Sequence, residues 1–279
     1  MYHKKVLHSV DIARQRILGV NVSAVNYAYV VDSIHKAIKD RNTQKIFCIA
    51  AVHLVMECQR NRQLKNDVNT AFITTPDGMP LALLLRLYGH RNVERVCGPK
   101  LMNILCTEAQ KNAYRIFIYG GRIGQSAMIV KKLKEQYPLL SIVGSQDTPD
   151  KKMSDEIQRV HVRAINAVKP DILFVGLGCP YQEMWMFHNK RKLCVPVVLG
   201  VGSSFDYISG YADQAPEWCQ NIGLEWFWRL LHDPRRLWFR YSIMNIWFLY
   251  EITIQIWKDF ILNRNLLNKK KSRNIFTMP

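Results

Sequence analysis

The sequence lacks the residue patterns that usually hold metal ions. Its eight histidines show no H-x-x-x-H or H-E-x-x-H spacing, which argues against a zinc site. It has no D-x-D, the carboxylate pair that commonly holds a divalent ion on a nucleotide diphosphate. The seven cysteines form no C-x-x-C pair, and several lie in apolar runs, so we expect buried free thiols in a reducing cytoplasm. The sequence therefore predicts an activity without a bound metal or cofactor.

Long apolar segments are also missing. No stretch gives 18 uninterrupted apolar residues, and residues 1–16 contain no apolar core of the length that a signal peptide needs. We therefore expect a cytoplasmic protein without a transmembrane span. The segment 201–206 lacks the G-x-S-x-G pattern of a nucleophile elbow, which argues against a serine hydrolase.

Positive charge is abundant, and it is unevenly distributed. The 39 Lys and Arg residues outnumber the 22 Asp and Glu residues, for a net charge of +17. From Arg229 to the end of the chain there are ten Lys or Arg residues against three Asp or Glu residues. Such an excess predicts an anionic partner, such as a nucleotide, a nucleic acid or an acidic lipid, but carries no information on fold.

Short apolar runs alternate with longer helical patterns. The expected strands are 16–25, 45–51, 70–75, 115–120, 139–145, 171–178 and 195–202. The expected helices are 26–40, 53–65, 79–90, 99–113, 124–137, 153–168 and 180–191. Continuous apolar strands separated by helices are typical of a parallel sheet covered on both faces. The sequence thus predicts an α/β, Rossmann-like domain over residues 1–222.

Ligands of such folds gather outside the carboxyl ends of the strands, where glycine and polar residues recur here. The candidate ligand-binding residues at these ends are Asp77, Gly120, Gly121, Gln182 and Asp206. Glycines let a phosphate or sugar approach the backbone, and helix N-termini favour anions, so the pattern favours a nucleotide-type ligand. The segment 119–124 is only a partial dinucleotide fingerprint, because Tyr119 replaces its first glycine, and this disfavours an NAD-dependent oxidoreductase.

Each of these polar residues also has a purely structural interpretation. Asp77 precedes Gly78, and Asp-Gly is common in turns, but a carboxylate at the ligand edge is also what a general base requires. Glu183 could complement a helix dipole, while Gln182 is better placed for ligand contact. Asp206 could cap a helix or bind a ribose or sugar hydroxyl.

The last part of the chain, residues 223–279, has a different composition. Aromatic residues alternate with arginines over 223–241, a mixture that suits either base stacking or the headgroup region of a bilayer. An apolar stripe with helical spacing follows, made of Ile243, Ile246, Trp247, Tyr250, Ile254, Trp257 and Ile261. Polar residues interrupt it, and a basic tail over 268–273 comes next. We expect an amphipathic helix lying on an anionic membrane surface, with an ordinary packed helix as the alternative.

Several motifs together resemble the WecG/TagA/CpsF glycosyltransferase family. The matching stretches, in family order, are 76–81 (PDGMPL), 95–102 (RVCGPKLM), 118–121 (IYGG), 175–186 (VGLGCPYQEMWM), 200–210 (GVGSSFDYISG) and 214–241. The resemblance implies transfer of a sugar from a nucleotide donor to an undecaprenyl-diphosphate-linked sugar during surface-polysaccharide synthesis. It also implies a Rossmann-like catalytic domain with a C-terminal appendage that meets the membrane.

The same resemblance implies roles for individual residues. Asp77, in the P-D-G motif, would be the general base, and Arg95 and Gln182 would line the sugar and diphosphate site. The turn at Gly120 and Gly121 and the carboxylate of Asp206 would hold the nucleotide. The residues expected to stabilise the diphosphate in place of a metal are Arg229, Arg235, Arg236 and Arg240.

The sequence departs from the family pattern near the expected sugar site. The family often carries Thr-x-Asn after its second strand, where this chain has Ala51-Val52-His53, so His53 is a further candidate substrate contact. Lys100 stands where an acid is usual, and Gln214 where arginine is common. These departures leave the donor sugar open.

We therefore expect an inverting, metal-independent glycosyltransferase that uses a UDP-sugar and a polyprenyl-diphosphate-linked acceptor. Its predicted location is peripheral, on the inner face of the plasma membrane, without a nucleic-acid partner and with a homo-oligomer as an open possibility. The alternative function is a non-enzymatic nucleotide- or RNA-binding module with a basic tail.

Overall fold

The chain folds into two compact units, Met1–Glu225 and Trp226–Pro279. The computed structural model describes residues 12–148, 150, 153–221 and 223–275, apart from the side chains of residues 217, 221, 236, 240 and 262–275. The first unit contains the central sheet and the second is helical.

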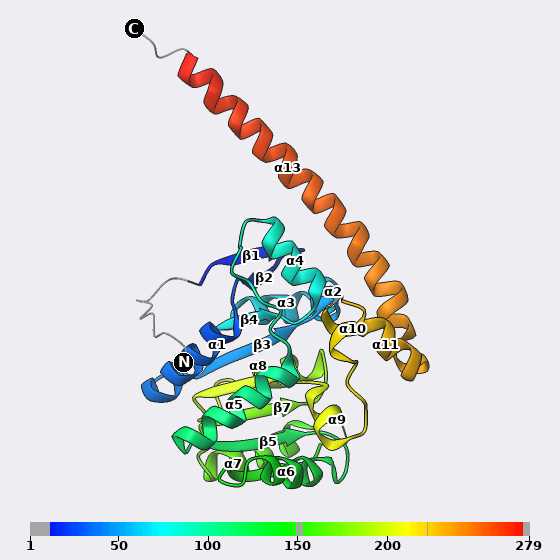
Figure 1. Cartoon of the computed structure of the whole chain (residues 1–279). Helices are drawn as coiled ribbons and strands as arrows, with labels where there is room; N and C mark the ends of the chain where they lie inside the picture. The colour runs from blue at the N-terminus through cyan, green and yellow to red at the C-terminus, as the bar shows by residue number, and fades with distance from the viewer. Residues whose placement is uncertain (1–11, 149, 151–152, 222, 276–279) are drawn as a thin grey trace. The chain divides into compact units, whose positions relative to one another are not determined.

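The first unit is built on a parallel sheet, which has six strands in the described part of the chain (Figure 1). In chain order the strands are β3 (Lys45–Ala50), β4 (Ile73–Pro76), β5 (Arg115–Gly120), β6 (Ser141–Gln146), β7 (Ile172–Gly176) and β8 (Val197–Gly200). Their order across the sheet is β4-β3-β8-β7-β5-β6, and every neighbouring pair is parallel. All six carboxyl ends therefore lie at one edge.

Helices cover both faces of this sheet. They are α1 (Tyr27–Asp40), α2 (Val52–Arg60), α3 (Arg62–Asn69), α4 (Met79–Leu87), α5 (Gly98–Asn112), α6 (Gln125–Gln136), α7 (Asp155–Ala167), α8 (Tyr181–His188), α9 (Ser204–Ser209) and α10 (Glu217–Asn221). Helices α1, α5, α6 and α9 share one apolar core with strand residues such as Phe47, Phe174 and Leu199. Helix α3 packs on α8 over the opposite face, where Asn189 also donates to Gln158 of α7. The predicted α/β class is confirmed.

Two of the expected elements were wrong. Residues 16–25 are not a strand of the main sheet but part of an antiparallel hairpin, β1 (Arg14–Ile17) and β2 (Val20–Ser23). The chain reverses at Leu18 and Gly19, which both have positive φ, of 47° and 81°. The single helix expected over 53–65 is two helices, because Asn61 ends α2 and its side chain caps α3 by accepting from the Leu64 amide.

The second unit consists of four consecutive helical segments in its described part. They are α11 (Glu225–His232), α12 (Pro234–Trp238), the π-helical turn η1 (Phe239–Met244) and α13 (Asn245–Ile275). Pro234 lies in the first turn of α12, where its missing amide donor costs nothing. None of the described helices is long and apolar enough to cross a membrane.

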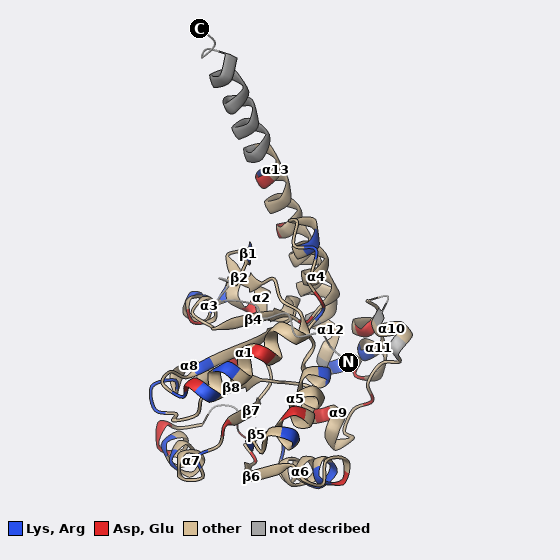
Figure 2. Cartoon of the chain, turned by 60° about the vertical axis from the view of Figure 1, so that its left-hand side comes forward, with Lys and Arg blue, Asp and Glu red and all other residues tan. Residues whose placement is uncertain are grey.

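The expected apolar stripe of the second unit is largely exposed. Ile246, Tyr250 and Trp257 are 68%, 64% and 65% exposed, whereas Phe248 and Ile252 are buried. Residues 246 and 250 lie one helical turn apart, and 248 lies about halfway round the helix from them. In Figure 2 the described part of α13 is mostly uncharged, unlike α6 and α7, which carry many charged residues. The side chains of the basic tail at 268–273 lie outside the described residues.

Candidate active site at the carboxyl edge of the sheet

The carboxyl edge of the sheet collects most of the candidate residues. Asp77 follows β4, His53 lies in the first turn of α2 after β3, and Gln182 lies in the first turn of α8 after β7. Gly120 ends β5, and Asp206 lies in α9, the helix that follows β8. Because neighbouring parallel strands present their carboxyl ends together, the topology brings these residues to one edge.

The main chain of Asp77 is held on both sides by hydrogen bonds. Its amide donates to the Ala50 carbonyl at the end of β3 (2.8 Å), and its carbonyl accepts from Nε of Arg95 (2.6 Å). The preceding residue is fixed as well, because the Val96 amide donates to the Pro76 carbonyl (2.9 Å). The carboxylate is therefore presented by a turn whose backbone is anchored on two sides.

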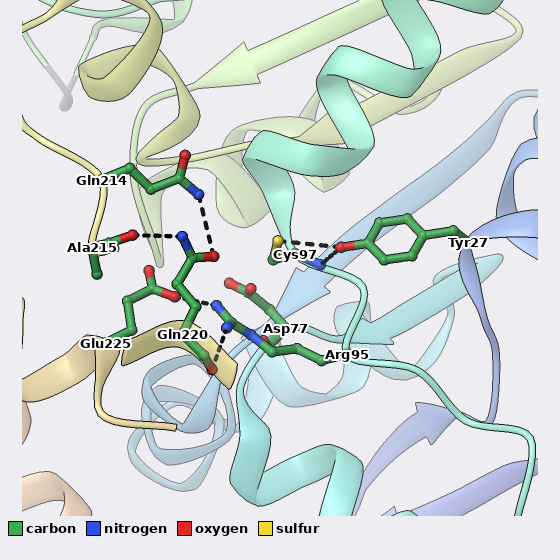
Figure 3. A network of polar contacts seen from close by, with 8 residues as sticks. All are labelled: Tyr27, Asp77, Arg95, Cys97, Gln214, Ala215, Gln220 and Glu225. Atoms are coloured by element: carbon green, nitrogen blue, oxygen red, sulfur yellow. Dashed lines mark hydrogen bonds and ion pairs between the residues drawn. The ribbon is translucent and has the colours of Figure 1, made fainter. Parts of the chain in front are cut away.

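Arg95 lies beside this carboxylate, in the segment between α4 and α5. Figure 3 shows its guanidinium next to Asp77, on the side of Gln220 and Glu225. Nη1 donates to the Gln220 carbonyl (3.4 Å), and Nη2 forms an ion pair with the Glu225 carboxylate. Burial would lower the pKa of Arg95, but the carboxylates of Asp77 and Glu225 outweigh it and raise this pKa. The guanidinium therefore keeps its charge.

A thiol and a phenol complete the surroundings of Asp77. The Tyr27 hydroxyl accepts from the Cys97 amide (2.9 Å) and lies 3.2 Å from its Sγ (Figure 3). Burial raises the pKa of both side chains, and the negative charge of Asp77 raises them further. Because the nucleophilic form of cysteine is the thiolate, a neutral Cys97 is poorly suited to attack a substrate. The carboxylate of Asp77 is the better candidate for proton transfer here.

Gln182 and Glu183 form a buried polar pair at the end of β7. Nε2 of Gln182 donates to Oε1 of Glu183 (2.8 Å), and both side chains are almost fully buried. Because a carboxylate only accepts, this contact fixes the amide with its oxygen directed elsewhere. That oxygen, Oε1 of Gln182, is buried without a hydrogen-bond partner in the described part of the protein. This oxygen is the acceptor of the Gln182 amide that the described part of the chain leaves unsatisfied.

The turn after β5 is arranged differently from a dinucleotide-binding loop. Asp147, which follows β6, accepts from the amides of Gly124 (2.7 Å) and Ser126 (2.8 Å) at the start of α6. A protein carboxylate thus occupies the helix N-terminus where a Rossmann fold would bind pyrophosphate. This arrangement agrees with the weak fingerprint in the sequence and argues against an NAD-type site.

Asp206 is connected to the same turn through one buried side chain. Nε2 of Gln125 donates to Oδ1 of Asp206 (3.1 Å) and to the Ser209 hydroxyl (3.1 Å), while its Oε1 accepts from the Arg122 amide (2.9 Å). The carboxylate of Asp206 is thus held beside the turn that contains Gly121. The structure brings these two predicted nucleotide-binding elements together.

Comparison with known proteins adds the chemical class. A sequence model of the glycosyl transferase WecG/TagA/CpsF family matches residues 15–260. The chain belongs to this family. It is therefore a glycosyltransferase, which confirms the class of enzyme that the sequence predicted.

Two bacterial enzymes are similar over most of their length. An N-acetylglucosaminyldiphosphoundecaprenol N-acetyl-beta-D-mannosaminyltransferase of Bacillus subtilis (strain 168) is 29% identical over 76% of this chain and 80% of its own. The enzyme of the same name from Bacillus spizizenii (strain ATCC 23059 / NRRL B-14472 / W23) is 29% identical over 71% of this chain and 75% of its own. Their name states both the transferred sugar and a lipid-linked acceptor.

The remaining predicted substrate contacts of this WecG/TagA/CpsF member are His53 and four arginines. His53 is partly buried, with Nδ1 at 3.9 Å from Glu57. Arg229 lies in α11 and Arg235 in α12, both in the second unit. The side chains of Arg236 and Arg240 lie outside the described residues. In the described part of the chain, no three His, Cys, Asp or Glu residues are arranged to hold a metal ion.

Sequence analysis missed three residues that shape this site, namely Gln125, Asp147 and Glu225. Their partners lie 81, 21–23 and 130 positions away in the chain, so local patterns give no sign of the contacts. Only for Asp147 was there a signal, an acidic residue directly after a strand.

Proposed function

We propose that this protein transfers a sugar from a UDP-sugar to a polyprenyl-diphosphate-linked sugar in the synthesis of a bacterial cell-surface polysaccharide. The observation that carries the proposal is the Asp77 turn, which presents a carboxylate at the carboxyl edge beside the charged guanidinium of Arg95. The two Bacillus relatives, named for transfer to N-acetylglucosaminyldiphosphoundecaprenol, support the acceptor class.

In this proposal Asp77 is the general base. Its carboxylate takes the proton of the acceptor hydroxyl while the hydroxyl oxygen attacks the anomeric carbon of the donor sugar. The bond from that carbon to the UDP oxygen breaks on the opposite side, so the configuration inverts and UDP leaves with the bonding electron pair. Gln182, with its buried acceptor oxygen, suits a hydroxyl or amide N–H of the sugar better than a phosphate oxygen.

Positive charge from arginine takes the place of a metal in this mechanism. Arg229, Arg235, Arg236 and Arg240 supply guanidinium groups that can bind diphosphate oxygens in pairs and offset the charge that develops on the leaving UDP. Asp206 and the turn at Gly120 and Gly121 hold the nucleotide. His53 and Lys100 stand where the family pattern differs, and we propose that they influence which sugar is accepted.

The test of this function is a UDP-release assay with a panel of UDP-sugars, with and without a short-chain polyprenyl-diphosphate-linked N-acetylglucosamine. We expect release with one donor, dependent on the acceptor and unchanged when EDTA is added. Donor turnover without any need for the acceptor would contradict the proposed reaction, and loss of activity in EDTA would contradict the role given to the arginines.

We further propose that the second unit binds the anionic inner face of the plasma membrane through the exposed face of α13. The exposed apolar residues Ile246, Tyr250 and Trp257 support this, since an amphipathic helix can bury such a face at the headgroup boundary. Tyr250 and Trp257 are also of the residue types that favour this boundary.

Changing Ile246, Tyr250 and Trp257 together to glutamine is expected to weaken binding to anionic liposomes about 100-fold or more, since each apolar side chain adds roughly 1–2 kcal/mol of burial. Liposome sedimentation measures the change. The matched control is Thr253→Ser, a polar-for-polar change on the same exposed face, which should leave binding nearly unchanged. Wild-type sedimentation of the triple variant would show that this face does not meet the membrane.

A further inference from the structure

Three nitrogen atoms of Arg95 are engaged by the protein itself. Nε donates to the main-chain carbonyl of Asp77 (2.6 Å), Nη1 to the carbonyl of Gln220 (3.4 Å), and Nη2 pairs with the Glu225 carboxylate. The side chains of Arg95 and Glu225 are only 16% and 13% exposed. A planar guanidinium with donors in fixed directions is suited to joining three such groups, and an ammonium is not.

These contacts make it energetically unfavourable for Arg95 to bind a substrate instead. A substrate diphosphate that took the guanidinium would leave the Glu225 carboxylate partly buried beside a second acid, Asp77. Removing one partner of a buried ion pair is strongly unfavourable, because the remaining charge loses its compensation. The contacts of Arg95 therefore favour a structural link between its neighbours over a direct bond to the substrate.

The two ends of this link have different functions in the chain. At one end is the Asp77 turn, which carries the proposed base. At the other end is Glu225, the last residue of the first unit and the first residue of α11. The same helix carries Arg229, four positions later. An ion pair that restrains Glu225 therefore restrains the first residue of α11.

We propose that Glu225 is a positioning residue, and that its ion pair with Arg95 ties the backbone of the Asp77 turn to the start of α11. In this role Arg95 acts on catalysis by holding Asp77, not as a ligand of the substrate diphosphate. The kinetic consequence rests on the proposed transferase function, whereas the restraint itself does not.

Three further contacts support the same junction. The main-chain carbonyl of Gln220 accepts from Nη1 of Arg95, and its side-chain Nε2 donates to the Ala215 carbonyl (2.6 Å). Nε2 of Gln214 donates to the side-chain oxygen of Gln220 (3.5 Å) (Figure 3). The Leu224 amide donates to the Cys219 carbonyl (2.9 Å). The described residues before Glu225 thus have hydrogen bonds of their own, and the ion pair joins them to the backbone of the Asp77 turn.

A double-mutant cycle on the full-length protein tests this link. Arg95→Gln, Glu225→Gln and the double variant are compared for kcat and for KM of donor and acceptor. We expect each single change to lower kcat about tenfold or more with KM changed less than about threefold, and the double variant to be no worse than the poorer single one, as for residues that act as one unit. The controls Arg91→Gln and Glu135→Gln, both at exposed positions that make none of the contacts of this network, should match the wild type.

A direct contact between Arg95 and the substrate would give a different kinetic result. If Arg95 binds the substrate, Arg95→Gln raises KM, Glu225→Gln leaves kcat unchanged, and the double variant behaves like Arg95→Gln alone. If Arg95→Gln does not fold, Arg95→Lys can still distinguish phosphate binding from the structural link. A lysine keeps the charge for a phosphate but cannot hold the Asp77 carbonyl and Glu225 together, so the proposal predicts the same loss of kcat.

Hydrogen exchange gives a readout that needs no activity. The proposal predicts faster amide exchange at Asp77, Gly78 and 224–228 in Glu225→Gln, with the rest of the sheet unchanged. Unchanged exchange at both places would overturn the link. If the wild type released no UDP with any donor, the proposed function would fail, while the exchange experiment would still decide whether the ion pair restrains the turn.

Discussion

Replacing Asp77 with asparagine is expected to lower kcat by about 10²–10⁴-fold, the range typical of losing a general base, with little change in KM for the donor. Asparagine has the same shape but cannot accept the proton of the acceptor hydroxyl. The fold should survive, because the contacts that place the turn use the amide and carbonyl of residue 77, which the substitution keeps. Steady-state UDP release by the purified variant measures the effect.

Two comparisons make this prediction specific. Asp213→Asn removes an exposed carboxylate and should retain wild-type kcat. The loss of charge at position 77 should also lower the pKa of the Cys97 thiol, because the field of Asp77 helps to raise it, and faster alkylation of Cys97 would report this. An Asp77→Asn enzyme with more than about a tenth of wild-type turnover would show that Asp77 only forms the turn, and the base would have to be sought elsewhere.

The sheet was predictable because its strands other than the edge strand β6 are buried on both faces. Six apolar runs bounded by turn residues correspond to β3 to β8, with strand 115–120 matching to the residue. The errors arose where one or two residues override a long pattern. Gly19 allows the hairpin turn inside the apolar run 16–25, and the capping side chain of Asn61 interrupts what otherwise looks like one helix.

The candidate site was predictable to the extent that it lies at strand ends. Asp77, Gln182 and Gly120 follow from the rule that ligands bind at the carboxyl edge of a parallel sheet. Contacts between distant parts of the chain could not be predicted, because they depend on the order of the strands in the sheet. The ion pair of Arg95 with Glu225 spans 130 positions, and no spacing in the sequence signals it. The resemblance named Arg95 but could not show what it contacts.

The requirement for glycine at position 120 has a cause within the protein. Gly120 has a φ of +116°, and a Cβ there would lie 2.8 Å from the carbonyl carbon and oxygen of Gly176, its partner on β7. These are main-chain atoms of a strand, which cannot move away by a change of rotamer as a side chain can. Close approach of two strands therefore explains this glycine, while its contact with the nucleotide remains a proposal.

Gly120→Ala is accordingly expected to reduce the free energy of unfolding by about 3 kcal/mol or more, because overpacking and backbone strain each cost about 1–3 kcal/mol. The matched control is Gly124→Ala in the same turn. Gly124 also has positive φ, +78°, but a Cβ there meets nothing within 4 Å, so only backbone strain of about 1–2 kcal/mol applies. Urea unfolding of both variants measures the difference. Equal losses would mean that backbone conformation alone demands glycine at position 120, and that β5 and β7 can separate enough at this edge to admit a side chain beside the site.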